Sequence, residues 1–230
     1  MRILGIIPAR GGSKGIPGKN IKYLGEKPLL AYTTEATLKS KLLNRSILSS
    51  DSEEIIEVGK KLGIQVPFVR PAKFAKDDSA SIKVLKQALY FFIKENIHFD
   101  AVCILQPTTP FRREGLIDDA IKKFESGSYD SLVSVREVPH EYNPHWVFEE
   151  KKGKLEIATG EKEIISRRQE LPKAYHRDGA IYLTKTEVIL DSNSILGKKI
   201  GFIDTTDEDY VNLDNMEDWK KAEEILKKRS

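Results

Sequence analysis

The residues best suited to chemistry form a glycine-rich, cationic stretch near the start of the chain. Residues 6–20 read IIPARGGSKGIPGKN, where an apolar run ends in several glycines, three cations (Arg10, Lys14 and Lys19) and no acid. Glycine lets a backbone approach a ligand closely and leaves amide N–H groups facing outward. With the added positive charge, such a loop is suited to a polyphosphate; the alternative is a solvated turn whose cations face water.

This loop does not match two common nucleotide-binding motifs. Counting back from Gly18-Lys19, a Walker A motif requires glycine where the chain has Ser13, and Ser or Thr where it has Asn20. The dinucleotide fingerprint G-x-G-x-x-G is also absent. The residues therefore predict a phosphate-binding loop of another kind.

A second polar turn follows another apolar run. Gln106 comes directly after residues 101–105 (AVCIL) and opens the turn QPTTP, whose two prolines stiffen it. A glutamine can both donate and accept hydrogen bonds, as recognition of a sugar hydroxyl or a base requires. Arg112, just after this turn, has two possible roles: pairing with a phosphate or capping the turn.

Composition restricts the class of protein. The chain has 230 residues, with 38 Lys and Arg mixed among 35 Asp and Glu, so its net charge of +3 does not by itself imply nucleic acid. Cys103 is the only cysteine and lies in an apolar run, which predicts a buried, inert thiol. The apolar run at the N-terminus is too short for a signal peptide or a membrane span. We therefore expect a cytoplasmic protein with neither nucleic acid nor membrane as a partner.

Short apolar runs alternate with stretches of helical periodicity. The apolar runs predict strands at residues 2–8, 45–50, 65–70, 100–110 (ending in the polar turn), 131–138, 179–184 and 198–204. The periodic stretches predict helices at residues 29–40, 53–63, 79–95, 113–126 and 215–228.

This alternation is typical of an α/β fold with a mostly parallel sheet covered on both faces. We expect three layers, a nucleotide-binding Rossmann-like arrangement, and a single domain over residues 1–230. A β-rich flap is expected at about residues 137–177, with a turn at Lys151–Lys154. Ligands bind such sheets at the carboxyl ends of the strands, and loops 9–20 and 106–112 both leave strands at that edge.

The order of the motifs resembles the acylneuraminate cytidylyltransferases, also called CMP-sialic acid synthetases. That family has Arg, then Ser-Lys-Gly, then Lys-Asn after its first strand, and this chain has Arg10, Ser13-Lys14-Gly15 and Lys19-Asn20. The similarity continues in order through SSD at 49–51, RPAKFAKDDSAS at 70–81, LQPTTPFR at 105–112, RRQELPKAYHRDGAIY at 167–182 and VNLDNMEDW at 211–219.

The resemblance implies a Mg²⁺-dependent nucleotidyltransferase. It would transfer CMP from CTP to the anomeric hydroxyl of a nine-carbon α-keto sugar acid (a nonulosonic acid such as N-acetylneuraminic, legionaminic or pseudaminic acid), releasing pyrophosphate. Two alternatives stay open: a nucleotidyltransferase for another sugar, such as 3-deoxy-manno-octulosonate, and a non-catalytic nucleotide-sugar-binding relative. The resemblance also implies a homodimer, in which the flap contributes residues to the neighbouring site.

The resemblance further implies roles for individual residues. The catalytic cations would be Arg10, Lys14 and Lys19. The residues that bind CTP would be Gly12, Ser13, Asn20, Arg70, Ser81 and Gln106. The residues that bind the sugar acid would be Gln106, Arg168, Gln169 and Tyr182, with an arginine gripping the carboxylate through two parallel hydrogen bonds.

Blander roles are also possible for some of these residues. Arg70 could be a surface arginine after an edge strand, and Ser81 could help cap the helix that follows it. The segment of Arg168 and Gln169 could be an exposed, charge-rich turn.

The closing segment departs from the family pattern. Many relatives hold the metal with an Asp-x-Asp pair, whereas this chain has Asn212 and Asp214. An amide oxygen can still ligate Mg²⁺ or a bound water, but with one negative charge fewer. Asp214 could also cap the last helix, alone or in addition to binding the metal.

Overall fold

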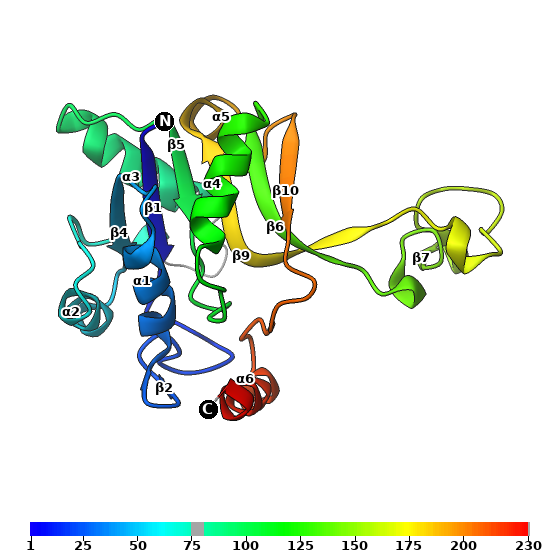
Figure 1. The fold of residues 1–230 in the computed structure, drawn as a ribbon, viewed down its shortest axis with the longest axis horizontal. Helices are drawn as coiled ribbons and strands as arrows, with labels where there is room; N and C mark the ends of the chain where they lie inside the picture. The colour runs from blue at the N-terminus through cyan, green and yellow to red at the C-terminus, as the bar shows by residue number, and fades with distance from the viewer. Residues whose placement is uncertain (75–80, 230) are drawn as a thin grey trace.

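A six-stranded sheet forms the centre of the molecule (Figure 1). The computed structural model describes residues 1–74 and 81–229. In spatial order, the strands are β10 (Ile200–Asp204), β6 (Ser131–Glu137), β9 (Tyr175–Lys185), β5 (Ala101–Ile104), β1 (Ile3–Pro8) and β4 (Arg45–Ser49). Every pair of neighbours is parallel except those made by β9, which is antiparallel to both β5 and β6. The expected mostly parallel sheet is confirmed.

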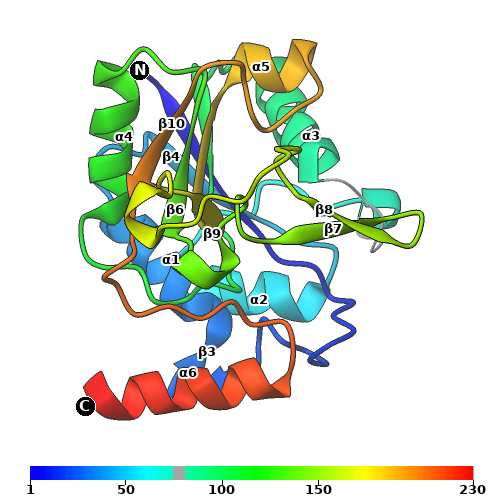
Figure 2. The same ribbon diagram turned by 90° about the vertical axis from the view of Figure 1, so that its right-hand side faces the viewer.

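Helices cover both faces of the sheet and complete the three layers (Figure 2). One face packs against α1 (Leu29–Lys39), α2 (Glu53–Lys61) and α4 (Leu116–Ser126), and the other against α3 (Ser81–Lys94) and α5 (Thr186–Asp191). Strand β1 serves both layers, because Ile3 and Ile7 join the first core while Leu4 and Ile6 join the second. This two-sided burial explains why the strands are almost continuously apolar.

The last helix packs beneath the glycine-rich loop rather than on the sheet. In α6 (Met216–Arg229), Trp219 and Ala222 form a separate buried cluster with Ile16 and Leu24. Leu24 belongs to a small hairpin of β2 (Tyr23–Leu24) and β3 (Lys27–Pro28). The C-terminal helix therefore packs against the loop that follows β1.

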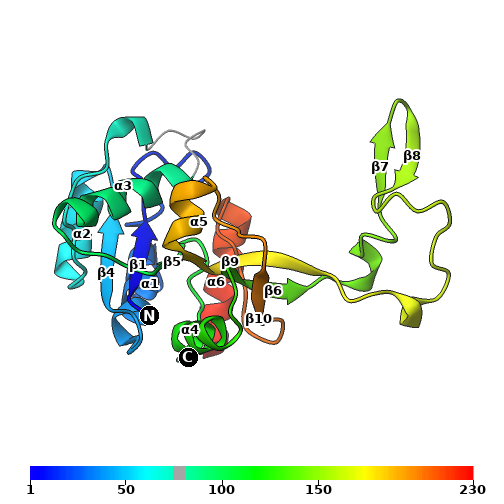
Figure 3. The ribbon, with the colours of Figure 1, turned by 90° about the horizontal axis from the view of Figure 1, so that it is seen from above.

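An extended arm leaves the sheet between β6 and β9 (Figures 1 and 3). We define the arm as residues 138–174. It contains the short 3₁₀ helices η2 (His140–Tyr142) and η3 (Arg168–Glu170) and the hairpin of β7 (Phe148–Lys151) and β8 (Lys154–Ile157). The hairpin turn consists of Lys152 and Gly153, both with positive φ, at the place where the sequence predicts a turn.

Several boundaries differ from the sequence-based prediction. The strand expected at residues 65–70 is wrong: only Gln65 makes a β-bridge, to Ile47, and Pro67 cannot donate to a ladder. Helix α4 begins at Leu116 rather than at residue 113, because Gly115 precedes it with φ +77°. Residues 79 and 80 of the predicted helix 79–95 lie outside the described residues.

Two further features of the body bear on the class of protein. Cys103 is fully buried in β5, and burial raises the pKa of its thiol to about 12, as expected for an inert cysteine. No helix in the described part of the chain is both long enough and apolar enough to cross a membrane.

Candidate active site

A cavity of about 390 Å³ opens beside the carboxyl ends of β1 and β5. Polar residues from distant parts of the sequence line it: Arg10, Ser13, Lys19, Asn20, Arg70, Gln106, Thr108, Asn212 and Asp214. Apolar residues complete the wall: Pro8, Phe74, Val84, Leu85, Ile104 and Pro107. The fold therefore brings most of the predicted site residues together.

Lys19 connects the glycine-rich loop to the closing segment. Its Nζ donates a hydrogen bond to the carbonyl oxygen of Leu213 at 2.5 Å and lies 3.9 Å from Oδ1 of Asp214. Burial lowers the pKa of the Lys19 ammonium, and the charge of Arg10 lowers it further, while Asp214 acts in the opposite direction. The cavity wall thus holds a partly desolvated cation whose electrostatic effect is stronger than that of a surface lysine.

Asn20 stabilises the loop from inside. Its side chain is buried, and Nδ2 donates to the carbonyl oxygen of Arg10 at 3.0 Å. The backbone carbonyl of Asn20 accepts a bond from the amide of Leu30 in α1 at 2.9 Å. Asn20 therefore ties the two ends of the loop together and anchors them to α1.

The glycines of the loop meet different structural requirements. A Cβ on Gly15 would lie 1.9 Å from the carbonyl oxygen of Asp214, so the loop packs directly against the closing segment. Gly18 has φ +61°, a conformation that disfavours other residues. A Cβ on Gly12 would meet no atom of the described residues within 4 Å. Gly12 thus faces open space, where a bound phosphate could approach the backbone closely.

Arg70 lies in the cavity wall as a buried cation. It is only 4% exposed, which excludes the solvated surface arginine considered from the sequence. Nε donates to Oγ of Ser49 at 3.1 Å, and a second guanidinium nitrogen donates to the carbonyl oxygen of the same residue. Burial lowers the pKa of Arg70 to about 10, and nearby Asp51 partly offsets this effect. Its position is fixed by the end of β4.

Gln106 reaches the cavity from the end of β5. Its backbone carbonyl accepts a bond from Arg112 at 2.7 Å, and its side-chain Oε1 packs against Gly179 of β9. Arg112 also donates to the carbonyl oxygen of Ala180 at 2.9 Å and to Oγ1 of Thr33 at 2.8 Å. Of the two roles considered for Arg112, these contacts favour the one that holds the turn, and Arg112 does not line this cavity.

The closing segment presents a carboxylate at the cavity rim. Nδ2 of Asn212 donates to Oδ2 of Asp214 at 2.6 Å, and the Asp214 side chain is 68% exposed. The helix is instead capped by Asn215, whose Oδ1 accepts the amides of Glu217 and Asp218 at 2.8 and 3.0 Å. Asp218 accepts the amides of Asp214 and Asn215 in return. The Asp214 side chain is therefore not the helix cap.

The oxygen donors at this rim suit Mg²⁺ bound together with a nucleotide. Among the described residues, no three His, Cys, Asp or Glu side chains form a cluster that could hold a metal alone. Mg²⁺ is commonly held by one or two carboxylates together with substrate phosphates and water. The carboxylate of Asp214 and the amide oxygen of Asn212 fit that mode of binding.

Four other predicted residues, all within the described part of the chain, do not line the cavity. Lys14 is exposed on the loop, and Arg168 and Gln169 lie in η3 of the arm, away from the body (Figures 1 and 3). Tyr182 is buried in the core on the α3 side of the sheet, where burial raises the pKa of its hydroxyl. Ser81 begins α3, but its side chain lies outside the described residues.

Some lining residues escaped the sequence analysis. Val84 and Leu85 reach the cavity from the start of α3, and Phe74 lies in the 3₁₀ helix η1 (Ala72–Phe74). The helical periodicity assigns Leu85 only to the core, because a period identifies an apolar face but not a cavity along it. Thr108 could have been predicted from the sequence, because it lies two residues after Gln106 in the same polar turn.

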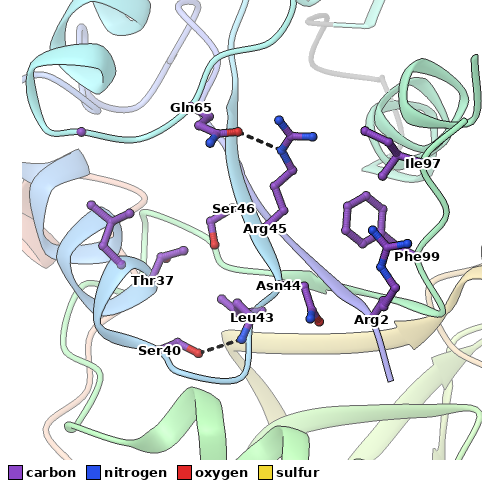
Figure 4. A pocket seen from close by; sticks show the side chains of 12 residues that line it. Arg2, Thr37, Ser40, Leu43, Asn44, Arg45, Ser46, Gln65, Ile97 and Phe99 are labelled. Atoms are coloured by element: carbon purple, nitrogen blue, oxygen red, sulfur yellow. Dashed lines mark hydrogen bonds between the residues drawn. The ribbon is translucent and has the colours of Figure 1, made fainter. Parts of the chain in front are cut away.

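A second cavity, of about 450 Å³, lies at the opposite ends of β1 and β4 (Figure 4). Arg45 donates from Nε to Oε1 of Gln65 at 2.9 Å there, and the guanidinium carbon of Arg2 lies 5.7 Å from the ring centre of Phe99. Among the residues that the structure describes, no predicted site residue lines this cavity. It faces the amino ends of the parallel strands, where such sheets rarely bind substrates.

The chain is similar to known cytidylyltransferases over its whole length. The family model "Cytidylyltransferase" matches residues 4–227. Pseudaminic acid cytidylyltransferase of Campylobacter jejuni is 35% identical, covering 99% of this chain and 97% of the relative. CMP-N,N'-diacetyllegionaminic acid synthase of Legionella pneumophila is 32% identical, covering 98% and 97%. The solved structure of CMP:2-keto-3-deoxy-manno-octonic acid synthetase complexed with CTP has a TM-score of 0.76 at 13% identity, with complete coverage of both chains.

Proposed function

The chain belongs to the cytidylyltransferase family, and from this premise we propose that it transfers CMP from CTP to the anomeric hydroxyl of a nonulosonic acid, releasing pyrophosphate. The sequence relatives named above act on pseudaminic and N,N'-diacetyllegionaminic acids, which supports this class of acceptor. The resemblance to the octonic acid synthetase is one of fold, so it gives little support to the alternative acceptor 3-deoxy-manno-octulosonate. The observation on which the proposal depends is that one cavity collects cations, amides and a carboxylate from segments far apart in the sequence.

The triphosphate is assigned to the glycine-rich loop. Arg10 and Lys19 supply positive charge, and Gly12 leaves room for close approach to the backbone. Lys19 is held at the closing segment, so it can oppose the charge that builds up on the phosphates during the reaction. Lys14, on the same exposed turn, would reach the outer phosphates.

The reaction needs positioning more than covalent chemistry from the protein. The anomeric oxygen forms a bond to the α-phosphorus while the bond from that phosphorus to the β-bridging oxygen breaks. Pyrophosphate leaves with the electron pair, and the hydroxyl proton is lost to solvent. We assign Gln106 the orientation of the acceptor or the nucleotide, because it lines the same cavity as the loop after β1 and the closing segment.

Mg²⁺ would be held at Asp214 and Asn212 and, when bound, would neutralise charge on the triphosphate. Asp214 also faces Lys19 across 3.9 Å, so this carboxylate has a cationic neighbour before nucleotide binds. Asn212 keeps Asp214 in place through the hydrogen bond between their side chains.

We further propose a homodimer in which the arm of one chain completes the site of the other. The arm projects away from its own body (Figure 3) and exposes large hydrophobic side chains, among them Phe148, Leu155 and Ile164. Arg168 and Gln169, the residues assigned to the sugar carboxylate, lie on this arm rather than at the cavity of the same chain. A partner chain would bury the apolar side chains and bring a guanidinium to the acceptor.

A coupled pyrophosphate-release assay tests the proposed function directly. Purified protein is given CTP and Mg²⁺ with a panel of pseudaminic, legionaminic, N-acetylneuraminic and 3-deoxy-manno-octulosonic acids, and ATP, GTP and UTP serve as controls. We expect release with CTP and at least one nine-carbon acid. Calorimetry with CTP and Mg²⁺ is the companion measurement; CTP binding without turnover of any acid would favour a non-catalytic binding protein.

A further inference from the structure

Strand β9 contains a bulge that packs against Gln106, a residue of the cavity wall. Its pairing with β6 runs from Val133 opposite Tyr182 to Val135 opposite Arg177, so one residue of β6, Ser134, lies opposite four residues of β9, 178–181. The extra residues, 178–180, lie at the point where β9 passes from the sheet toward the arm. Bulges next to active sites commonly redirect side chains.

Asp178 holds this bulge from inside the protein. It is only 3% exposed, and its Oδ1 accepts bonds from the amide of Ala180 at 2.8 Å and from the hydroxyl of Ser134. Its Oδ2 accepts a bond from Oγ1 of Thr205 at 2.5 Å. A buried carboxylate is costly unless its oxygens are satisfied, so these donors identify a specific structural role. No step of the proposed reaction uses Asp178.

The bulge contacts Gln106 in two ways. Gly179 has φ +84°, and a Cβ there would lie 2.7 Å from Oε1 of Gln106, so the carboxamide packs against the bare backbone of the bulge. Arg112, which is 9% exposed, donates both to the carbonyl oxygen of Ala180 in the bulge and to that of Gln106. A shift of the bulge would therefore be transmitted to both the backbone and the side chain of Gln106.

We propose that Asp178 is a positioning residue, which acts through the bulge at 178–180 to fix the carboxamide of Gln106 in the cavity. This inference rests on the proposed function, since it assigns Gln106 a place at the reacting groups. Of the two partners considered for Gln106, it assigns the sugar acid rather than the nucleotide, so the triphosphate loop, which has its own supports, is largely unaffected.

The replacement Asp178→Ala removes both carboxylate oxygens and the three hydrogen bonds that they accept, and so frees the bulge. We expect kcat/KM for the sugar acid to fall roughly 30-fold to 300-fold, comparable to losing a well-placed hydrogen bond in a transition state. The Kd for CTP should change by less than about twofold, because Lys19 and Arg70 are held by other residues. The replacement Asp178→Asn should restore most of the activity. Its amide oxygen can accept from Ala180, and its NH₂ can donate to Thr205, which keeps its own bond to Val135.

A double-mutant cycle with Gln106→Ala separates positioning from general destabilisation. If Asp178 acts through Gln106, Asp178→Ala should cost little further activity in the Gln106→Ala background. Asp118→Ala is the matched control, because Asp118 also accepts bonds from a serine and backbone amides but joins α4 to the loop after α1. Equal kinetic losses in both backgrounds, or in Asp118→Ala, would overturn the proposal.

A readout without turnover distinguishes failure of this inference from failure of the proposed function. The side-chain amide signal of Gln106 in ¹H–¹⁵N spectra, identified by its loss in Gln106→Ala, should shift in Asp178→Ala and stay near its place in Asp178→Asn and Asp118→Ala. If Asp178→Ala does not fold, Ser134→Ala and Thr205→Val each remove one donor and should give smaller shifts of the same signal. An unmoved signal would refute positioning even if every sugar acid were turned over.

Discussion

Lys19 illustrates how one side chain of the cavity depends on partners far away in the sequence. Its ammonium is bonded to Leu213 and faces Asp214, while burial lowers its pKa. A cation with a lowered pKa loses its charge at a lower pH than an ordinary lysine does. The charge of Lys19 is thus more sensitive to alkaline conditions than that of an ordinary lysine.

The dependence of kcat/KM on pH should reveal the pH at which Lys19 loses its charge. We expect Lys19→Met to lower kcat/KM by roughly 10²-fold to 10³-fold, since a charge opposing the phosphates is lost. In the wild type, the alkaline limb of kcat/KM should lie below the pKa of a free lysine, because the lowered pKa belongs to the free enzyme. Lys19→Arg should move that limb to higher pH. Identical alkaline limbs for wild type and Lys19→Arg would contradict the assignment.

Asn212 offers a prediction about metal affinity. Asn212→Asp adds a second carboxylate beside Asp214, where the two side chains already touch at 2.6 Å. The Mg²⁺ concentration for half-maximal activity should fall about fivefold, equivalent to roughly 1 kcal/mol of added attraction. Asn212→Ala is the matched control and should raise that concentration. Titrations of activity against Mg²⁺ measure both, and no change in Asn212→Asp would place the metal elsewhere.

At the residue scale, much of the candidate site could be predicted because its side chains stand in recognisable local patterns. Arg10 and Gln106 come just after buried strands, Lys19 lies in the loop that Arg10 opens, and strand ends of a parallel sheet meet at one edge. Asp178 could not be predicted, because its role depends on a register shift between two strands. Val84 was hidden for a similar reason, since only the assembled fold shows which turn of α3 borders the cavity.

At the scale of elements, the packing of the glycine-rich loop against the closing segment gives a matched pair of variants. Gly15→Ala should destabilise the protein by about 2–4 kcal/mol, because the new Cβ would overlap the carbonyl oxygen of Asp214. Gly12→Ala should change stability by less than about 0.5 kcal/mol, since no atom of the described residues lies within 4 Å.

Thermal or urea unfolding measures the difference in stability between Gly15→Ala and Gly12→Ala. Calorimetry with CTP measures, in addition, how each variant binds the nucleotide. Gly12→Ala should weaken CTP binding despite its normal stability, because the methyl group enters the space assigned to the phosphates. Equal stability of the two variants would mean that the loop and the closing segment are not in close contact in solution.

Helices and strands could be predicted where a local sequence pattern, such as a helix cap or an apolar period, identifies them. Helix α2 begins where Ser52 caps it, and α3 shows a long apolar period. The antiparallel direction of β9 has no local signature, because a buried strand is apolar whichever way it runs. Helix α5 has only six residues, too few for a period to be recognised.

At the scale of the whole molecule, the arm separates residues that the proposed reaction needs together. Arg168 and Gln169 lie on the arm and Lys19 lies in the body, and in the proposed dimer a second chain would combine them. Light scattering after size-exclusion chromatography should give twice the mass of the 230-residue chain. A monomer at micromolar concentration would contradict the proposed assembly.

Mixing two inactive variants tests whether the sites are shared. Lys19→Met and Arg168→Ala should each be nearly inactive alone. After unfolding and refolding together, half of the dimers are mixed, and each mixed dimer has one intact site, so about a quarter of wild-type activity should return. The control is a mixture of Lys19→Met with Gln106→Ala, which both damage the body and should not complement each other.

The bond between Lys19 and Leu213 spans nearly the entire chain and has a consequence for biosynthesis. The amide of Leu213 also donates a hydrogen bond to the carbonyl oxygen of Thr108. Both the glycine-rich loop and the turn after β5 therefore depend on contacts with the closing segment, which is synthesised late. During translation the sheet strands up to β10 emerge before that segment does. A nascent chain interrupted after β10 would contain every strand of the sheet but would lack the part of the cavity wall formed by Asn212 and Asp214. Nucleotide binding should therefore become possible only late in synthesis.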